Sequence, residues 1–532
     1  MTVYLEKFLA EKLYRDSLFF FIVFFSIFNF IPEKVQIGLL GGSVSSKLVI
    51  LPLFLLMFFS LYSQYKYGNI FKNYSIFKRY FFVYLIGLLL SLIMGVYYFP
   101  YLHEIISGPL ITNTKLSIII NFLNNHNISI QQNTLAWYYY VLWDIKEVIT
   151  LAFWTFGGSY LIYCLFYDDW KKCFELILKG IFSSLVIICI YSVIEIFYLA
   201  GNEYAANILT VINPYIHIIE SSYGWWPPLL LKGQLRSVFE EPSHFGIWAS
   251  FAIPFVWYVI FKVKKIGGLA ATYFVWFFLS FCLFLSNART VLAIFLFELF
   301  LISFLMLYLY RKVFIKKVVL VILVTAIAFS ASNYFQQNLL YYNTYKISSV
   351  EEYLKTNVTS IVSSDSRSNT ARYSVALAHL KIGMAYPLFG VGYNLSNSYI
   401  KDYLPEMAEN SGEVKMWLKL QDEKGLLKSG FPKLGEWTSR FSETGIINLF
   451  IYLLPIMILL NKLGKKILHN NEQKLPYIMF LISFLGMLIT GFSNILNITY
   501  CYWILLGLGY AMCFGKEYDV KDNGDTGSRQ EH

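Results

Sequence analysis

Charged side chains are scarce in this chain. Only 14% of its 532 residues are charged, whereas 57% are hydrophobic and 19% are aromatic. A soluble protein of this length could not cover its surface with so few charges. Long apolar runs recur from one end of the sequence to the other, so we expect most of the chain to lie in lipid.

Motifs for metal or cofactor chemistry are also missing. The six cysteines lie in or beside apolar runs, and none has the spacing of a metal ligand. This placement predicts neither a disulfide framework nor cysteine chemistry. The sequence contains no metal-ligand cluster, no nucleotide-binding glycine loop and no Asp-x-Asp motif. We therefore predict no metal site and no cofactor.

About twelve apolar segments are long enough to cross a membrane, which predicts an all-α polytopic membrane protein. With the N-terminus placed in the cytoplasm, the inside segments hold 24 lysines and arginines and the short outside segments hold seven. Because short cytoplasmic loops are the basic ones, both termini are predicted to be cytoplasmic. The net charge of +10 therefore reflects topology, and no nucleic-acid partner is expected. The segments are residues 17–32, 48–64, 81–99, 147–167, 177–200, 244–261, 267–285, 290–310, 318–334, 445–461, 475–492 and 498–514.

One large loop divides the predicted helices unequally. Residues 1–334 hold the first nine spans with short loops, and residues 335–443 form a mainly helical loop on the outer side. Residues 444–514 hold the last three spans, and residues 515–532 form a polar cytoplasmic tail that we expect to be disordered. Trp225-Trp226-Pro-Pro, in an earlier outer loop, reads as an aromatic anchor at the interface.

The clearest element of the large loop is an amphipathic helix over residues 372–382. We expect Asn369 or Thr370 to cap it and Pro387 to follow its end. The predicted apolar face consists of Tyr373, Ala376, Leu377 and Leu380.

Residues that could carry chemistry gather on the predicted outer face. Arg289 lies in a tight turn at residues 286–290, and Arg372 and Arg440 come from the large loop. A guanidinium group donates to phosphate oxygens bidentately and keeps its charge when it is partly desolvated. Arginines beside carboxylates therefore suit a ligand with a diphosphate head and a lipid tail. The remaining members precede or begin the sixth predicted span, and they are Arg236, Glu240, Glu241 and His244.

The same residues also admit structural roles. Arg289 could place its charge at the membrane interface or cap a helix. Glu240 and Glu241 suit the positive end of a helix with Ser243 as its cap, and His244 could be structural.

Two carboxylates lie within predicted membrane helices. Glu195 is near the outer end of the fifth span, and Glu298 lies in the eighth. An ionisable residue in a membrane helix is a functional candidate by default, although Glu298 could instead pair with a neighbouring helix.

Four motifs follow in a fixed order over about residues 230–450. They are Arg236-Ser-Val-Phe-Glu-Glu241-Pro-Ser243, Ser286-Asn-Ala-Arg289-Thr290, Arg372 with Pro387-Leu-Phe-Gly390-Val-Gly392 fifteen residues later, and Glu436-Trp through Arg440 to Glu443-Thr-Gly445. The ordered set resembles the O-antigen polymerase and ligase superfamily. The related ligases usually carry a histidine about a dozen residues before the last glycine. This chain has Leu434 and Gly435 there, which favours a polymerase.

The resemblance implies a metal-independent membrane glycosyltransferase at the periplasmic face of a bacterial inner membrane. Its donor and acceptor would be undecaprenyl-diphosphate-linked oligosaccharides, and membrane lipids and a chain-length regulator are further expected partners. Arg236, Arg289 and Arg372 would stabilise the departing diphosphate, and Arg440 would bind the acceptor's diphosphate. Glu241 would be the base that takes the acceptor's proton, with Glu240 or His244 as alternatives.

Two other functions remain open from the sequence. One is an O-antigen ligase that transfers polymer to lipid A-core. The other is a flippase or transporter of the same lipid-linked oligosaccharide, although transporters are often built from two similar halves and no such repeat is visible here.

Overall fold

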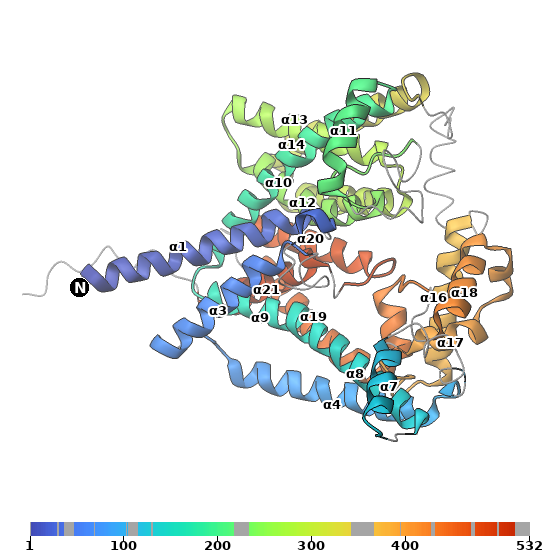
Figure 1. The fold of residues 1–532 in the computed structure, drawn as a ribbon. Helices are drawn as coiled ribbons and strands as arrows, with labels where there is room; N and C mark the ends of the chain where they lie inside the picture. The colour runs from blue at the N-terminus through green and yellow to red at the C-terminus, as the bar shows by residue number, and fades with distance from the viewer. Residues whose placement is uncertain are drawn as a thin grey trace, which may run out of the picture.

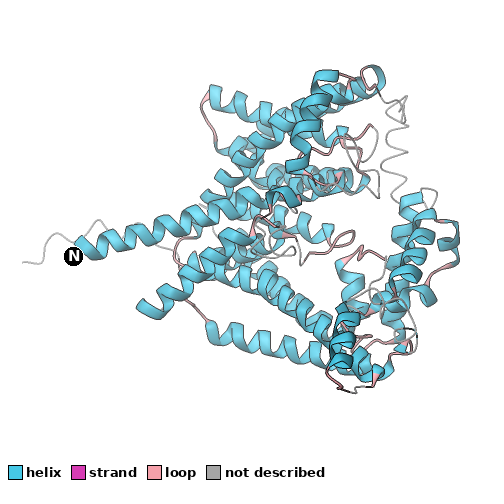
Figure 2. Cartoon of the chain, in the orientation of Figure 1, coloured by secondary structure: helices cyan, strands magenta, loops and turns pink. Residues whose placement is uncertain are grey.

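The protein is a bundle of long helices with a helical cap at one side (Figure 1). This computed structural model describes residues 2–28, 31–36, 47–68, 70–102, 104, 115–128, 131–217, 233–341, 367–393, 395–426, 431–469, 474–496 and 499–516. Across these residues the regular structure is helical throughout, without strands (Figure 2). The predicted aromatic anchor at residues 225–228 and nearly all of the predicted disordered tail lie outside the described residues.

The helices of the N-terminal half are α1 (Thr2–Phe24), η1 (Phe25–Ile27), η2 (Glu33–Val35), α3 (Ile50–Tyr67), α4 (Tyr74–Tyr98), α7 (Lys115–Asn125), α8 (Gln132–Leu151), the π-helix η4 (Ala152–Gly157), α9 (Gly158–Leu165), α10 (Trp170–Leu199) and α11 (Glu203–Ile216). Those of the C-terminal half are α12 (Pro242–Lys262), α13 (Ile266–Leu285), α14 (Arg289–Asn338), α16 (Arg367–Ala385), α17 (Ser396–Tyr403), η7 (Glu406–Asn410), α18 (Gly412–Lys424), α19 (Glu436–His469), α20 (Lys474–Thr490) and α21 (Tyr500–Phe514).

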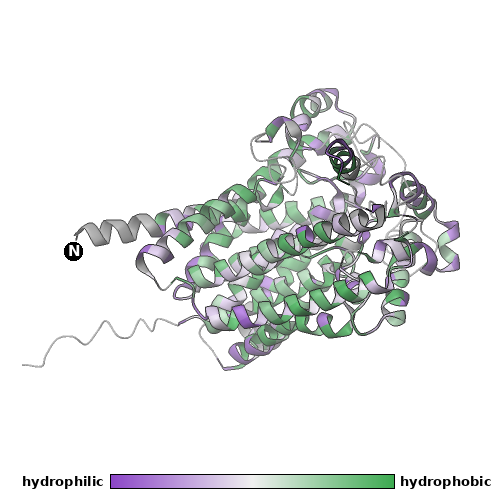
Figure 3. Cartoon of the chain, turned by 60° about the horizontal axis from the view of Figure 1, so that its bottom comes forward, coloured by the Kyte–Doolittle hydropathy of each residue, from purple (hydrophilic) through white to green (hydrophobic). Residues whose placement is uncertain are grey.

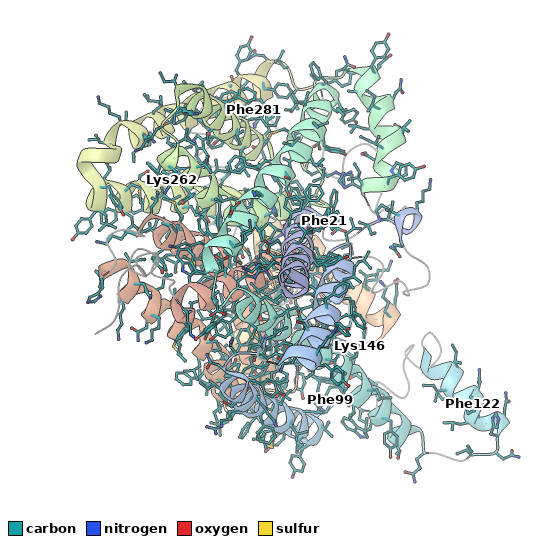
Figure 4. The ribbon with its side chains drawn as sticks, turned by 90° about the vertical axis from the view of Figure 1, so that its left-hand side faces the viewer. Phe21, Phe99, Phe122, Lys146, Lys262 and Phe281 are labelled. Carbon is teal, nitrogen blue, oxygen red and sulfur yellow. The ribbon has the colours of Figure 1, made fainter. Side chains whose placement is uncertain are left out.

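The prediction of a helical multi-pass membrane protein is confirmed. Among the described residues, eight helices are long and apolar enough to cross a membrane, and three shorter apolar helices accompany them. Hydrophobic residues run along the helices of the bundle, and hydrophilic residues gather at helix ends and on the cap (Figure 3). Seen from the N-terminal side, Phe281 of α13 and Phe99 beyond α4 lie toward opposite sides of the bundle (Figure 4). The number twelve stays a prediction.

Individual helices differ from their predicted spans. Of the segment predicted at residues 17–32, residues 17–24 form the end of α1, and the 3₁₀-helix η1 follows directly. The two spans predicted at residues 290–310 and 318–334 form one element, α14, with a kink at Tyr310. Gln336, near the end of α14, donates to the carbonyl oxygen of Phe284, just before its start. The two halves of α14 are therefore antiparallel and correspond to the two predicted spans.

Several helices begin at a short polar residue whose side-chain oxygen accepts a backbone N–H group of the first turn. Asp169 accepts the backbone N–H of Lys172 at the start of α10. Ser411 does the same for Val414 at the start of α18. These contacts satisfy backbone donors that a helix N-terminus otherwise leaves open.

The cap is built from α16, α17 and α18, and it lies on the side opposite the N-terminal end of α1 (Figure 1). Its apolar core includes Phe99 from the end of α4, Ile382 from α16 and Tyr399 from α17. The placement of the cap agrees with the predicted separation of the large loop from the N-terminus, while the orientation in a membrane stays a prediction.

The predicted details of α16 were wrong in two respects. The helix begins at Arg367, so Asn369 and Thr370 lie within it and do not cap it. Tyr373 and Leu377 are exposed. The buried face consists of Ala371, Val375, Ala378 and Ile382. This face packs into the apolar core of the cap with Tyr399 of α17 and Val414 of α18, so tertiary packing overrides the larger apolar residues that suggested the other face.

Candidate active site

A buried carboxylate holds the turn that carries Arg236. Glu195 of α10 is 2% exposed, and its two oxygens accept the backbone N–H groups of Arg236 at 3.1 Å and Ser237 at 2.7 Å. Ser237 adopts a left-handed backbone conformation, with φ of 56°. Its hydroxyl accepts a hydrogen bond from Ser192 at 2.9 Å. A left-handed serine is unfavourable by itself, so Glu195 and Ser192 stabilise this turn from within the bundle.

The guanidinium group of Arg236 is buried beside the turn that Glu195 holds. Its side chain is 4% exposed, and Nη1 donates to the carbonyl oxygen of Glu240 at 3.4 Å. A second polar network lies nearby, in which Tyr191 contacts Asn213 at 2.7 Å and His217 at 3.0 Å. Burial lowers the pKa of His217 well below its usual value, and the charge of Arg236 adds to this shift. His217 is therefore neutral, and Arg236 carries the positive charge here.

The Glu-Glu-Pro-Ser segment starts α12, as its structural interpretation expected, but the cap differs. The helix begins at Pro242 with Glu241 in the N-cap position. Ser243 lies inside the helix, and its hydroxyl donates to Glu241 Oε2 at 3.0 Å. One turn along, His244 Nδ1 lies 3.7 Å from Glu240 Oε2. Two carboxylates and an imidazole therefore surround the positive end of one helix.

The Arg289 turn lies beside this segment. The backbone N–H of Leu235 donates to the carbonyl oxygen of Leu285 at 3.2 Å, which joins the Arg236 loop to the end of α13. Gly246 of α12 packs so closely on Val291 of α14 that a Cβ atom would overlap the valine side chain. Arg289 is the first residue of α14 and is half-buried. The first two motifs therefore meet at the same end of the bundle.

Arg372 reaches this group from the cap. Besides Glu240, the charges of Glu241 and Arg372 act on His244. Glu413 of α18 belongs to the same neighbourhood. Partial burial raises the pKa of its carboxyl group, the charge of Arg372 opposes this shift, and that of Glu241 adds to it. The mouth of α12 thus faces an arginine and a carboxylate from the cap.

Backbone hydrogen bonds join the third motif, around Gly390, to the fourth motif, around Gly445. Val391 and Gly392 donate to the carbonyl oxygens of Ser442 and Glu443, each at 3.0 Å. Ile446 donates to Pro387 at 2.8 Å. These contacts fix the position of α16 relative to α19.

Glycine is required where these two segments cross. Gly390 and Gly445 both have φ of 69°, in the region that glycine adopts without a steric penalty. A Cβ atom at Gly445 would overlap the backbone of Leu388, and one at Gly390 would overlap that of Glu443. Gly445 also forms the kink in α19.

Arg440 contacts a different set of residues from the other site arginines. Its Nε donates to Glu436 Oε1 at 2.7 Å, and both side chains are almost fully buried. The guanidinium group lies over the rings of Tyr393 and Tyr452, at 4.9 and 5.2 Å from their centroids. Glu436 in turn accepts the backbone N–H of Leu496 at 3.0 Å. Glu436 thus joins α19 to the segment between α20 and α21 and pairs with Arg440. The proposed contact of Arg440 with a diphosphate stays a prediction.

Three further polar residues were not singled out from the sequence. Lys433 forms a 2.6 Å ion pair with the buried carboxylate of Glu443. His379 of α16 lies 2.8 Å from the hydroxyl of Ser442. Burial lowers the pKa of His379 to about 3, and the charge of Lys433 contributes. This histidine is therefore neutral and structural near neutral pH.

The remaining carboxylate candidate, Glu298, has a simpler environment. It is fully buried in α14 and accepts a hydrogen bond from Ser250 of α12 at 2.5 Å. This contact is the interhelical pairing that its structural interpretation expected. The hydrogen bond between Ser250 and Glu298 stabilises the packing of α12 on α14. These two helices also carry His244 and Arg289.

The structure thus gathers Arg236, Glu240, Glu241, His244 and Arg372 around the start of α12, with Arg289 in the adjoining turn. Glu413 escaped sequence reasoning because an acidic residue in the first turn of a capped helix is common. Nothing in its local pattern distinguishes it from the other acids of the cap.

Comparison with known families agrees with the motifs. Residues 273–416 match the family model described as O-antigen ligase. This match extends from α13 through the Arg289 turn and α16 to the first part of α18. A comparison with curated proteins finds no match.

Proposed function

We propose that this multi-pass membrane protein is an O-antigen polymerase of the O-antigen polymerase/ligase superfamily, whose members are glycosyltransferase-like enzymes. It joins undecaprenyl-diphosphate-linked oligosaccharide repeat units into a longer chain at the periplasmic face of the inner membrane. Both termini are cytoplasmic in this proposal, so the cap and the mouth of α12 face the periplasm.

The observation that carries the proposal is the convergence of arginines and carboxylates at the start of α12. Transfer of a glycan from a diphosphate needs cationic groups where negative charge develops, and a base where a hydroxyl loses its proton. Arg236 and Arg289 come from the bundle, and Arg372 comes from the cap. Glu241 belongs to the same neighbourhood as Arg372.

In the proposed reaction, a hydroxyl oxygen at the non-reducing end of the acceptor attacks the anomeric carbon of the donor. The bond between this carbon and the diphosphate oxygen breaks, and its electron pair leaves with the lipid diphosphate. The proton of the attacking hydroxyl passes to Glu241. Arg236, Arg289 and Arg372 stabilise the charge on the departing group, and the cap covers both glycans.

A ligase is the second candidate, because the matched family model is described as O-antigen ligase. A ligase would use the same donor but transfer the finished polymer to lipid A-core. The position where related ligases usually carry a histidine is filled here by Leu434 and Gly435, and this favours the polymerase.

The assignment of the base is tested by exchanging Glu241 for Gln. The amide keeps the size and can still accept from Ser243, but it cannot take up the proton. We expect the rate of polymer formation to fall by about 10²–10⁴-fold with little change in protein level. Glu240→Gln is the matched control, because the Glu240 carboxylate lies 3.7 Å from His244 Nδ1, whereas the charge of Glu241 also acts on Glu413 of the cap. Near-normal rates for Glu241→Gln would refute this role.

A strain that lacks the protein separates polymerase from ligase. Loss of a polymerase leaves lipid A-core with a single repeat unit, because ligation continues. Loss of a ligase or a flippase leaves core without any repeat unit. The lipopolysaccharide ladder on a gel reads out this difference directly.

A further inference from the structure

At the end of α4 that lies away from the cap (Figure 1), a cavity of about 330 Å³ is enclosed by α4, α9, α19 and α21. Its size falls at the lower end of the range of small-molecule sites. Two of its lining residues, Ile76 of α4 and Ile458 of α19, are 66% and 41% exposed, so the cavity opens at the lateral surface of the bundle. Its other walls come from α9 and α21.

Most polar groups in these walls are paired with the protein, and the exception is the hydroxyl of Tyr80, which is buried without a hydrogen-bond partner among the described residues. Asn73 donates to the hydroxyl of Tyr163 at 2.6 Å, and Tyr510 donates to the carbonyl oxygen of Pro455 at 3.0 Å. The hydroxyl of Tyr160 donates to the carbonyl oxygen of Lys72 at 2.9 Å. Phe77 stacks on Tyr160 with ring centroids 4.0 Å apart. Apart from the Tyr80 hydroxyl, these walls present hydrocarbon and aromatic faces, which suit an apolar chain.

The mouth of the cavity is basic. Lys462 lies one turn beyond Ile458 on the same face of α19, and Lys465 follows on that face. The ammonium group of Lys462 is 5.7 Å from the centroid of Phe514, which lines the cavity. Lys72 precedes α4 on the opposite wall. Acidic residues near this end are engaged with other parts of the protein: Asp169 caps α10, and Asp16 pairs with Arg15.

We propose that this cavity is a binding site for an anionic phospholipid, independent of the glycan site. One acyl chain enters between α4 and α19, and the phosphate of the headgroup contacts Lys462, Lys465 and Lys72. The apolar cavity, which opens at the lateral surface of the bundle, accounts for binding of the acyl chain. The lysines on both sides of its mouth account for the preference for an anionic headgroup. A zwitterionic phospholipid would gain the first interaction without the second.

The site is tested on the purified full-length protein in mild detergent. Native mass spectrometry would count retained phospholipid, and thermal unfolding would be followed while dioleoyl-phosphatidylglycerol or dioleoyl-phosphatidylcholine is added. We expect one retained phosphatidylglycerol and a stabilisation that phosphatidylcholine does not match. The double variant Lys462→Gln, Lys465→Gln should need about 30-fold more phosphatidylglycerol, since each basic contact with an anionic lipid contributes about a factor of five.

Ile458→Trp tests the apolar slot, because the indole would occupy the space of the chain. It should lose the retained lipid. Ile446→Trp, an exposed residue of the same helix near its other end, is the matched control, and Lys264→Gln with Lys265→Gln controls for charge. Equal stabilisation by both phospholipids, a polyprenyl phosphate in place of the phospholipid, or unchanged retention in both the lysine and the Ile458 variants would overturn the proposal.

Discussion

Exchanging Glu195 for Gln tests whether this buried carboxylate positions Arg236. The carboxylate accepts two backbone N–H groups, from Arg236 and Ser237. Glutamine has the same shape but only one acceptor oxygen, so one N–H group would face an amide N–H₂ group instead. A buried donor that loses its acceptor costs about 1–3 kcal/mol, and we expect a loss of this size in the free energy of unfolding.

The effect on activity should exceed the effect on stability. Arg236 is placed by the turn that Glu195 holds, and a misplacement of about 1 Å at a reacting centre can lower the rate about 10²-fold. Unfolding would be measured by denaturing-detergent titration in mixed micelles, and activity by the lipopolysaccharide ladder at matched protein levels.

Glu298→Gln is the control for this prediction. Glu298 is equally buried in a membrane helix, but its contact is the hydrogen bond that Ser250 donates to Oε1, and a glutamine oxygen accepts that bond as well. We expect a loss well under about 1 kcal/mol. If Glu195→Gln were as stable and as active as Glu298→Gln, the carboxylate would not be what positions Arg236.

Four further predictions follow from the same structure. Arg289→Lys and Arg372→Lys keep the charge but lose the bidentate donors, so both variants should shorten the polymer ladder severely. Lys401→Ala, the control, should leave the ladder unchanged. Normal ladders from both arginine variants would show that these arginines only anchor the chain at the membrane interface. Gly445→Ala should destabilise the protein by more than about 1–2 kcal/mol because of its positive φ and the overlap with Leu388, whereas Gly464→Ala, which has open space, should not. His379 remains unprotonated in the folded protein down to a pH of about 3, whereas the unfolded chain binds a proton below about pH 6.5; stability is therefore lost as pH falls below 6.5, by up to about 1.4 kcal/mol per pH unit, and His379→Asn should flatten this dependence. A cysteine at Lys419 should react with an impermeant thiol reagent applied from the periplasm and one at Lys265 should not; the reverse pattern would invert the proposed topology.

Periodicity and charge predicted the helical architecture well, because membrane helices must satisfy their own backbone and carry long apolar runs. The helices within the predicted outer loops, α7 and α11, were missed because they are short and their flanks carry no comparable apolar run. The buried face of α16 was misassigned, since its alanines give a weak hydrophobic signal even though they permit close packing.

The candidate site was accessible from the sequence wherever a motif kept its residues close together. Arg236, Glu240, Glu241 and His244 fall within nine consecutive positions around the start of α12, so their short separation along the chain already keeps them near one another. The contact of Glu195 with the Arg236 turn joins residues 41 and 42 positions apart, and that of Lys433 with Glu443 depends on how α19 enters the bundle. Such contacts arise from tertiary packing, which no local pattern encodes.

Reconstitution of the purified protein with a synthetic undecaprenyl-diphosphate-linked repeat unit tests the proposed activity most directly. With that single substrate, the account predicts a ladder of products that differ by one repeat unit and a stoichiometric release of undecaprenyl diphosphate. The ladder should be absent with Arg372→Lys and strongly reduced with Glu241→Gln. If the substrate stayed monomeric in the active preparation and was transferred only when lipid A-core was added, the protein would be a ligase and the proposed polymerase function would be wrong.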